Sequence, residues 1–279
     1  RKMASLAEQI DRILHGEELQ IMEHCCEGEF AVLATSIDKM VQRMLEQQSI
    51  LQKEKVFLAD SMADISHQMK TPLTSISLLL NLLQEEHLSE KKRLQYVQDL
   101  MKLTGRIDWM VYALLRLAKL DAGTVQLQQI PYQIEDLIKA AVTPLEIALD
   151  IRDITLEVQM QPDLQHRGDI SWMTEAVSNI LKNCMEHTPS GGHIRIVTKD
   201  NPLYLLIKIT DSGSGFTKQD LPHIFERFYR GQNADTDSVG IGLALAKRII
   251  IAQNGTIRAY NHKKDGGAVF EIRMYKGAV

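Results

Sequence analysis

The chain has 279 residues, of which 44% are hydrophobic and 24% charged, the composition of an ordinary globular protein long enough for two hydrophobic cores. Its formal net charge of −4 gives no electrostatic reason to expect a nucleic acid as partner, although nucleotide binding through backbone amides needs no positive charge. The three cysteines are an odd number and two of them are adjacent, which argues against a disulfide framework and favours a reducing compartment.

The chain opens with RKMASLAEQ, without an initiator methionine, so we expect it to be part of a longer protein. It contains no signal peptide and no run of about 18 apolar residues that could span a membrane. A basic pair at the start is typical of a segment just inside a membrane, and the hypothesis is that a membrane anchor precedes Arg1. His24, Cys25 and Cys26 could form a metal cluster, but no second Cys/His pair stands at ligand spacing, so the sequence favours no metal there.

Apolar residues recur at alternating spacings of three and four from Ile37 to Leu83, interrupted only by two polar residues and Pro72. This heptad pattern continues over more than four repeats and predicts a long helix with one apolar seam. A second stretch, from Tyr96 to Leu117, repeats the pattern after the polar link QEEHLSEKKR.

Ser89 in that link is a credible helix cap, and Glu90 suits the positive end of the helix dipole. The two helices therefore form a predicted hairpin. Because one hairpin buries only one stripe of each helix, we expect two chains to pair as a homodimer in a four-helix bundle.

The stretch SHQMKTPL, residues 66–73, places His67 on the outward face of the first helix, between two residues of the seam. Asp64 and Thr71, three residues before and four after, share this face. A lone exposed histidine is usually only solvated. However, Pro72 removes a backbone hydrogen bond and bends the helix, at a cost of about 3 kcal/mol in helix stability. A helix built only for stability would avoid this cost. A bend beside an exposed histidine therefore predicts a reacting or moving site.

The pattern changes after LDAGTV, where Gly123 is a plausible helix stop. Beyond it the sequence predicts helices over 169–187 and 241–253, and strands over ITLEVQM, HIRIVTK, LYLLIKITD, GTIRAY and GAVFEIRM. Helices mixed with mostly antiparallel strands predict an α/β sandwich in which helices pack on one sheet face. The fold class is thus multi-domain, with an α-helical hairpin followed by an α/β sandwich.

Two motifs in this second half suggest a ligand site. NILKNCMEH, residues 179–187, puts Asn179 and Asn183 on one helix face, where amide oxygens can ligate a hard metal and amide nitrogens can donate to phosphate. DSGSG, residues 211–215, ends an apolar strand with Asp211, which could read an exocyclic amine, and glycines that admit a flat ring. Alone, each has an ordinary alternative: asparagine pairs are common, and DSGSG could be a plain turn.

Two further motifs follow. In IFERFYR, residues 224–230, two phenylalanines can anchor a loop while Arg227 and Arg230 reach phosphates; a short amphipathic helix is the alternative. In GIGLALAKR, residues 240–248, glycines precede a helix whose free amides point at an anion, although a lone G-x-G is weak evidence. The polar segment RGQNADTDSV between them predicts a lid.

Taken in order, these motifs resemble those of the sensor histidine kinases of bacterial two-component systems. SHQMKTPL is similar to the H-box of that family, NILKNCMEH to its N-box, DSGSG and GIGLALA to its two glycine boxes, and FERFYR to its F-box. The five motifs cover about residues 60 to 275 in family order. The N-terminal LAEQIDRILHGEE and EGEFAVLATSIDKM resemble more loosely the end of a HAMP module, and a coiled-coil linker is the alternative.

The resemblance implies three parts: a HAMP-like remnant or coiled-coil signalling linker (1–57), a dimerisation and histidine-phosphotransfer hairpin (58–122) and a Bergerat-type ATP-binding domain (123–279). It implies that ATP phosphorylates His67 and that the phosphoryl group passes to an aspartate of a response regulator, in the cytoplasmic part of an inner- or plasma-membrane protein. Thr71 would orient water when the regulator is dephosphorylated. Asp211 would read the adenine amine and Asn183 would hold Mg²⁺. The implied nucleotide-binding residues are Asn179, Asn183, His187, Asp211, Gly213, Gly215, Arg227, Arg230, Gly240, Gly242 and Leu243.

One departure from the family lies at Gln68, where many members carry Asp or Glu directly after the histidine. Glutamine cannot take a proton at neutral pH. Either Gln68 orients the ring and solvent takes the proton, or Asp64 stands in, or the autokinase is weak and the chain acts mostly as a phosphatase through Thr71.

A second departure is Glu186, three residues after Asn183, where relatives often place a lysine near the phosphates. The candidate replacement cations are Arg227, Arg230 and Lys182. Two other functions stay open. A chaperone-like or topoisomerase-like ATPase would share the pocket but lack the histidine hairpin, and a catalytically dead scaffold would use the hairpin only to dimerise.

Overall fold

The structure is a computed structural model that describes residues 29–85, 87–231, 239–262 and 266–277. The chain divides into two compact units, Arg1–Ile65 and Ser66–Val279. The HAMP-like residues before position 29, with the His24-Cys25-Cys26 cluster, lie outside the described residues, as does most of the predicted lid. Over the described ranges, none of the helices combines the length and the apolar character that crossing a bilayer requires.

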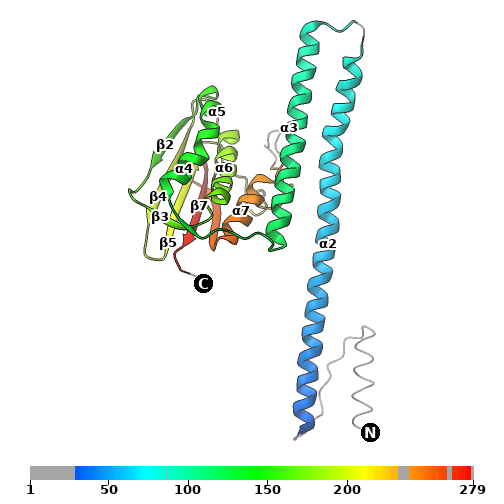
Figure 1. Cartoon of the computed structure of the whole chain (residues 1–279), viewed down its shortest axis with the longest axis vertical. Coiled ribbons are helices and arrows are strands. Elements are labelled where there is room, and N and C mark those ends of the chain that lie inside the picture. Colours follow the sequence, from blue (N-terminus) through cyan, green and yellow to red (C-terminus); the bar gives the residue numbers. More distant parts are fainter. Residues whose placement is uncertain (1–28, 86, 232–238, 263–265, 278–279) are drawn as a thin grey trace. The chain divides into compact units, whose positions relative to one another are not determined.

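The long apolar seam forms helix α2, Glu29–Leu83, which runs on through Pro72 (Figure 1). The predicted helix is therefore confirmed. Several large seam residues stay exposed in the single chain: the exposed fraction is 50% at Met44, 64% at Leu51 and 61% at Met62. An apolar stripe left in water over this length is what a second helix would cover.

Helix α3, Glu90–Asp121, starts at the predicted cap, where the Lys92 amide donates to the Ser89 hydroxyl at 3.4 Å. It ends one residue before Ala122, and the chain then turns at Gly123, whose φ of 62° is one that glycine adopts without a Cβ penalty. Within the second unit, α3 runs antiparallel to the part of α2 from Ser66 on (Figure 1), which confirms the helical hairpin.

The sheet of the following domain has five strands in the order β2-β4-β5-β7-β6. Only the β2–β4 pair is parallel. The strands are β2 Thr155–Gln159, β4 His193–Asp200, β5 Tyr204–Asp211, β6 Gly255–Asn261 and β7 Ala268–Tyr275. Buried and less buried residues alternate strictly along β5, because successive side chains point to opposite faces of the sheet.

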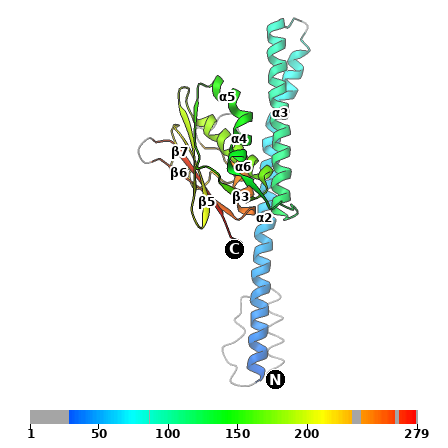
Figure 2. The same ribbon diagram turned by 60° about the vertical axis from the view of Figure 1, so that its left-hand side comes forward.

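Helices cover one face of this sheet (Figures 1 and 2). They are α4 Ile134–Val142, α5 Glu146–Ile151, α6 Ile170–His187 and α7 Gly242–Ala252, with a short 3₁₀ turn, η1, at Thr143–Leu145. The buried residues of α6 recur at helical spacing from Met173 to Cys184, and α6 packs against both α4 and α7. The predicted α/β sandwich is confirmed.

The segment between Gly123 and Thr155 holds elements for which the sequence pattern makes no prediction. It contains α4, α5 and strand β1 (Ile130–Gln133), which pairs antiparallel with β3 (Gln165–Gly168). The signal for α4 is nonetheless present, because its apolar residues recur at helical spacing and are buried in the structure.

Candidate functional site

A cavity of about 440 Å³ is lined by residues of α6, of the loop after β5, of the N-terminus of α7 and of α3. This volume lies in the usual range for small-molecule sites, which is about 300–1,000 Å³. The cavity brings together nine of the eleven predicted nucleotide-binding residues: Asn179, Asn183, His187, Asp211, Gly215, Arg230, Gly240, Gly242 and Leu243.

Asp211 forms the buried end of the cavity, with an exposed fraction of 3%. One carboxylate oxygen, Oδ1, accepts hydrogen bonds from the backbone amides of Gly213 at 2.9 Å and Ala268 at 3.0 Å. Gly213 thus holds Asp211 in place and does not line the cavity itself. A carboxylate fixed in this way offers its remaining acceptor capacity to a ligand.

The buried thiol of Cys184 is hydrogen-bonded to this carboxylate. Burial raises the pKa of the Cys184 thiol well above its usual range, and the charge of Asp211, which also accepts the thiol hydrogen bond, raises it further. The thiol therefore stays protonated, so it acts as a donor to Asp211 and not as a nucleophile.

Two close backbone approaches shape the cavity beside Asp211. A Cβ at Gly267 would lie 1.8 Å from the Asp211 carbonyl oxygen, and a Cβ at Gly213 would lie 2.4 Å from that of His187. No side chain fits at either position, so the strand end and the loop pack against each other through backbone alone.

The amide face of α6 forms another wall. Asn179 and Asn183 both line the cavity, and α7 begins beside them, since a Cβ at Gly242 would lie 3.3 Å from Asn179 Oδ1. The first backbone amides of α7 have no partner within their own helix, and the helix dipole there favours an anion. Side-chain amides and helix amides together make this wall suited to phosphate.

The base of the predicted lid is closed by a backbone hydrogen bond. The Phe228 amide donates to the Gly240 carbonyl at 2.9 Å, and Phe228 adopts a φ of 62°. A Cβ at Gly240 would lie 2.5 Å from the Tyr229 carbonyl oxygen, so only glycine fits there. IFERFYR is a run of turns and not the short helix of the alternative interpretation.

The two arginines of this motif have different environments. Arg230 lines the cavity, as expected. Arg227 does not line it, because its guanidinium forms an ion pair with Asp121 at the end of α3. Arg248 of α7 pairs with the same carboxylate at 2.7 Å. In this arrangement the prediction that Arg227 reaches the phosphates is not met.

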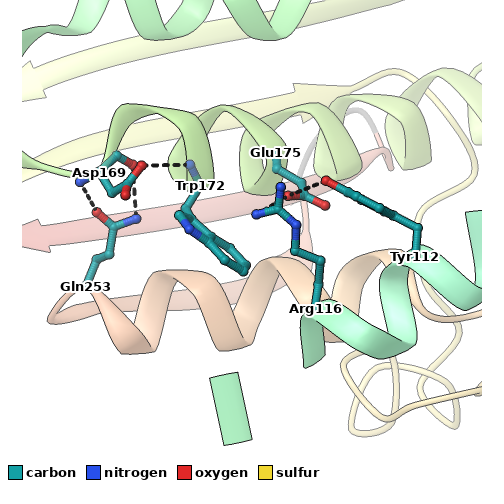
Figure 3. A network of polar contacts seen from close by, with 6 residues as sticks. All are labelled: Tyr112, Arg116, Asp169, Trp172, Glu175 and Gln253. Carbon is teal, nitrogen blue, oxygen red and sulfur yellow. Dashed lines mark hydrogen bonds and ion pairs between the residues drawn. The ribbon is translucent and has the colours of Figure 1, made fainter. Parts of the chain in front are cut away.

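A second polar contact joins α3 to α6 (Figure 3). Glu175 accepts from the Tyr112 hydroxyl at 3.4 Å and pairs with Arg116 at 3.3 Å. The Arg116 guanidinium also lies 4.0 Å from the centroid of the Trp172 ring. Burial raises the pKa of Glu175 above its usual range, and this effect exceeds the opposing effects of Arg116 and Tyr112.

To the left of Trp172, the same view shows how α6 is anchored at its start (Figure 3). Asp169 caps the helix by accepting from the Trp172 amide at 3.2 Å. Gln253, after α7, binds the backbone of Asp169 on both sides, with its Oε1 at 2.7 Å from the amide and its Nε2 at 3.3 Å from the carbonyl. The start of α6 and the end of α7 are thereby tied together, which fixes the two helices relative to each other.

Sequence reasoning missed the contribution of α3 to the cavity. Lys102, Leu103, Gly105, Arg106 and Trp109 all line it. Lys102, Arg106 and Trp109, at spacings of four and three, mark one helix face, but nothing in the sequence indicates which distant helix that face meets.

His67 is exposed on α2, and so are Asp64 and Thr71. Gln68 is half-buried and Pro72 is buried. The Thr71 hydroxyl donates to the His67 carbonyl at 3.4 Å, which leaves its oxygen able to accept a further hydrogen bond. The prediction that the histidine faces outward is therefore met in the single chain.

Models of two protein domain families match parts of the chain. Residues 58–123 match the His Kinase A (phospho-acceptor) domain. Residues 168–277 match the histidine kinase-, DNA gyrase B-, and HSP90-like ATPase. The first match contains His67 and the second contains the cavity residues of the α/β domain.

Individual relatives agree with these matches. The heme sensor protein HssS of Staphylococcus saprophyticus is 28% identical over 276 residues, which are 99% of this chain and 58% of the relative. The sensor protein SphS of Synechococcus elongatus is 32% identical over 225 residues, 76% of this chain and 53% of the relative. The chain thus spans a little over half the length of these relatives.

Among solved structures, the histidine kinase ThkA in complex with the response regulator protein TrrA has a TM-score of 0.67 at 18% identity, over 84% of this chain and 66% of that one. The Acinetobacter baumannii histidine kinase AdeS has a TM-score of 0.62 at 19% identity, over 76% of this chain and 98% of that one. At this identity the likeness concerns the fold, and it agrees with a helical region followed by an α/β ATPase domain.

Proposed function

We propose, since this chain belongs to the bacterial sensor histidine kinases, that it uses ATP to phosphorylate its own His67 and passes the phosphoryl group to an aspartate of a response regulator. One observation carries the proposal: a cavity closed by a buried, hydrogen-bonded Asp211 occurs in the same chain as a histidine on an exposed helix face. A chaperone-like or topoisomerase-like ATPase has no use for the second feature.

Asp211 is suited to bind the adenine ring. Its Oδ1 is engaged by two backbone amides, so Oδ2 would accept a hydrogen bond from the exocyclic amine. Phe216 and Ile224 line the cavity nearby and offer apolar surface to a flat ring. A guanine would present a carbonyl oxygen at this place, which a carboxylate repels.

The wall of Asn179, Asn183 and the α7 amides is suited to the phosphates. Among the described residues no group of three or more His, Cys, Asp or Glu side chains could hold a metal ion. Mg²⁺ would therefore rely on the amide oxygen of Asn183 together with phosphate and water oxygens, a ligand set that this hard cation prefers. When bound, Mg²⁺ neutralises charge on the phosphates.

The transfer itself needs chiefly alignment. A neutral ring nitrogen of His67 would attack the γ-phosphorus, the bond to the β–γ bridging oxygen would break, and ADP would leave. The phosphorylated ring is then cationic and releases the proton on its other nitrogen. In a later step the phosphoryl group moves from His67 to a carboxylate oxygen of the regulator. Only the neutral ring has a free lone pair with which to attack.

Gln68 is half-buried and follows His67 directly, and it would orient the ring without accepting the proton. Exposure of His67 on its helix face gives solvent direct access for that role. The same exposure suits phosphatase chemistry, in which the Thr71 oxygen would orient a water toward the phosphorylated regulator. The alternative is a chain with weak autokinase activity that acts mostly as a phosphatase or a scaffold. Gln68 favours it because glutamine cannot take the proton.

We further propose that the chain works as a homodimer, because the exposed seam of α2 offers a continuous apolar face to a second hairpin. The proposed parts remain a linker up to residue 57, a phosphotransfer hairpin from 58 to 122 and an ATP-binding domain from 123. Gly123, whose backbone adopts the left-handed conformation, is the proposed hinge between the hairpin and the ATP-binding domain.

The test is incubation with γ-labelled ATP and Mg²⁺, followed by acid and alkali treatment of the protein. We expect label that is lost in acid and kept in alkali, and its complete loss in His67→Gln. His87→Gln, at another exposed histidine, is the matched control and should keep the label. Equal labelling of wild type and His67→Gln would refute His67 as the acceptor.

A further inference from the structure

Glu186 creates a charge problem in the cavity. It lines the cavity together with Asn179, Lys182 and Asn183 of α6, and it shares their helix face because it lies four residues after Lys182 and three after Asn183. A carboxylate on this wall repels a triphosphate. Of the three cations nominated from the sequence, Arg227 pairs with Asp121 outside the cavity, so it does not offset Glu186 here.

Cations reach the same wall from α3. Lys102, Arg106 and Trp109 line the cavity and lie on one face of α3, at spacings of four and three. Trp109 fixes where this face points, because its ring lies 5.4 Å from Lys182 Nζ on α6. Lys102 and Arg106 precede Trp109 along this face, so they face the wall formed by Lys182, Asn183 and Glu186.

We infer that Arg106, assisted by Lys102, binds the phosphates of the nucleotide. Arg106 thereby takes the place of the lysine that relatives often carry on the α6 wall, where this chain has Glu186. The inference deepens the proposed function, on which it rests. It also means that the triphosphate site is complete only when the ATP-binding domain rests on α3. A planar guanidinium can bind two phosphate oxygens at once, which makes Arg106 the stronger of the two ligands.

The position of Arg106 along the hairpin, measured from the link between α2 and α3, fits this role. His67 is 16 residues before Leu83, the last residue of α2 (83 − 67), and Arg106 is 16 residues after Glu90, the first residue of α3 (106 − 90). At 1.5 Å per residue, each lies about 24 Å from the hairpin link. The phosphates would thus be held at the level of the acceptor histidine, where in-line transfer needs them.

The experiment is titration calorimetry of the whole chain with Mg-ATP and, separately, with adenosine. We expect Arg106→Gln to weaken ATP about tenfold and to leave adenosine within twofold, because only the phosphates meet this side chain. Arg106→Lys should lose less than Arg106→Gln. Arg93→Gln, an exposed arginine of α3 outside the cavity, is the matched control and should leave both affinities unchanged.

A rescue variant strengthens the test. Adding Glu186→Lys to Arg106→Gln removes a repelling charge and supplies an attracting one, so it should restore most of the ATP affinity. Equal ATP affinity of wild type and Arg106→Gln overturns the inference while the proposed function stands. A parallel loss of ATP and adenosine also overturns it, because that loss indicates a structural role. A wild-type chain that binds no ATP refutes the proposed function itself, and the inference with it.

Discussion

The contact of Asp121 with Arg227 and Arg248 should hold the ATP-binding domain against α3, and Asp121→Asn tests this. The substitution keeps the size of the side chain and removes its charge from both ion pairs. Asp121 lies two residues before the proposed hinge at Gly123. Loss of its two ion pairs should therefore allow the domain to move away from α3 about this hinge, without unfolding either part.

The magnitude follows from the exposure of the three side chains, which is 32% for Asp121, 23% for Arg227 and 41% for Arg248. Solvent screens pairs of this kind, so each contributes about 0.2–1 kcal/mol. Loss of both pairs should therefore change the docked-to-undocked ratio by a factor of about 2 to 30, at about 1.4 kcal/mol per tenfold. The Arg116–Glu175 pair remains and keeps part of the population docked.

Tryptophan emission reports the docking directly. The chain has two tryptophans, and both lie at this contact: Trp109 beside Lys182 and Trp172 under Arg116. We expect the emission of Asp121→Asn to shift to the red as both rings meet more water. Raising the salt concentration should shift wild type in the same direction, because it screens exposed ion pairs, and should shift Asp121→Asn less.

Asp99→Asn, a charge removal on the same helix outside the contact, is the control and should leave the emission unchanged. The reasoning is refuted if Asp121→Asn shows the emission and the salt response of wild type. In that case the ion pairs are a consequence of docking and do not stabilise it.

Three further predictions concern single positions. Gly267→Ala should abolish ATP binding in calorimetry and lower the melting temperature, since its Cβ would lie 1.8 Å from the Asp211 carbonyl oxygen; retained binding would show that this loop is free to move. Burial lowers the pKa of His166 below its ordinary 6.5, so only the unfolded chain takes up this proton readily as the pH falls. Stability from this group is complete above pH 6.5 and decreases below it, by at most about 1.4 kcal/mol per pH unit, and His166→Gln should flatten the melting-temperature profile between pH 7.5 and 5.5. Gln68→Glu should raise the autophosphorylation rate about 10²-fold or more if a proton acceptor is lacking, whereas a wild-type rate in Asp64→Asn would exclude Asp64 as the substitute base.

Much of the fold could be read from local patterns. The heptad seam predicts α2 whether or not anything packs on it, because a spacing of three and four places apolar side chains on one helix face. The cap at Ser89 and the turn at Gly123 were predictable for the same local reason. The segment holding α4 and α5 is harder to predict, because β1 is only four residues long and includes Pro131, which is uncommon within a strand.

The candidate site divides in a similar way. Asn179, Asn183, Asp211 and the glycines could be named because each sits in a motif whose backbone geometry is set by its neighbours in sequence. The sequence by itself therefore determined the hairpin, the outward histidine and the walls of the nucleotide cavity that these motifs build. Only the tertiary structure decided that Arg106 enters the cavity and that Arg227 turns away to Asp121, 106 residues distant. Such contacts depend on how two separately formed surfaces dock, and no periodicity within either segment records its partner.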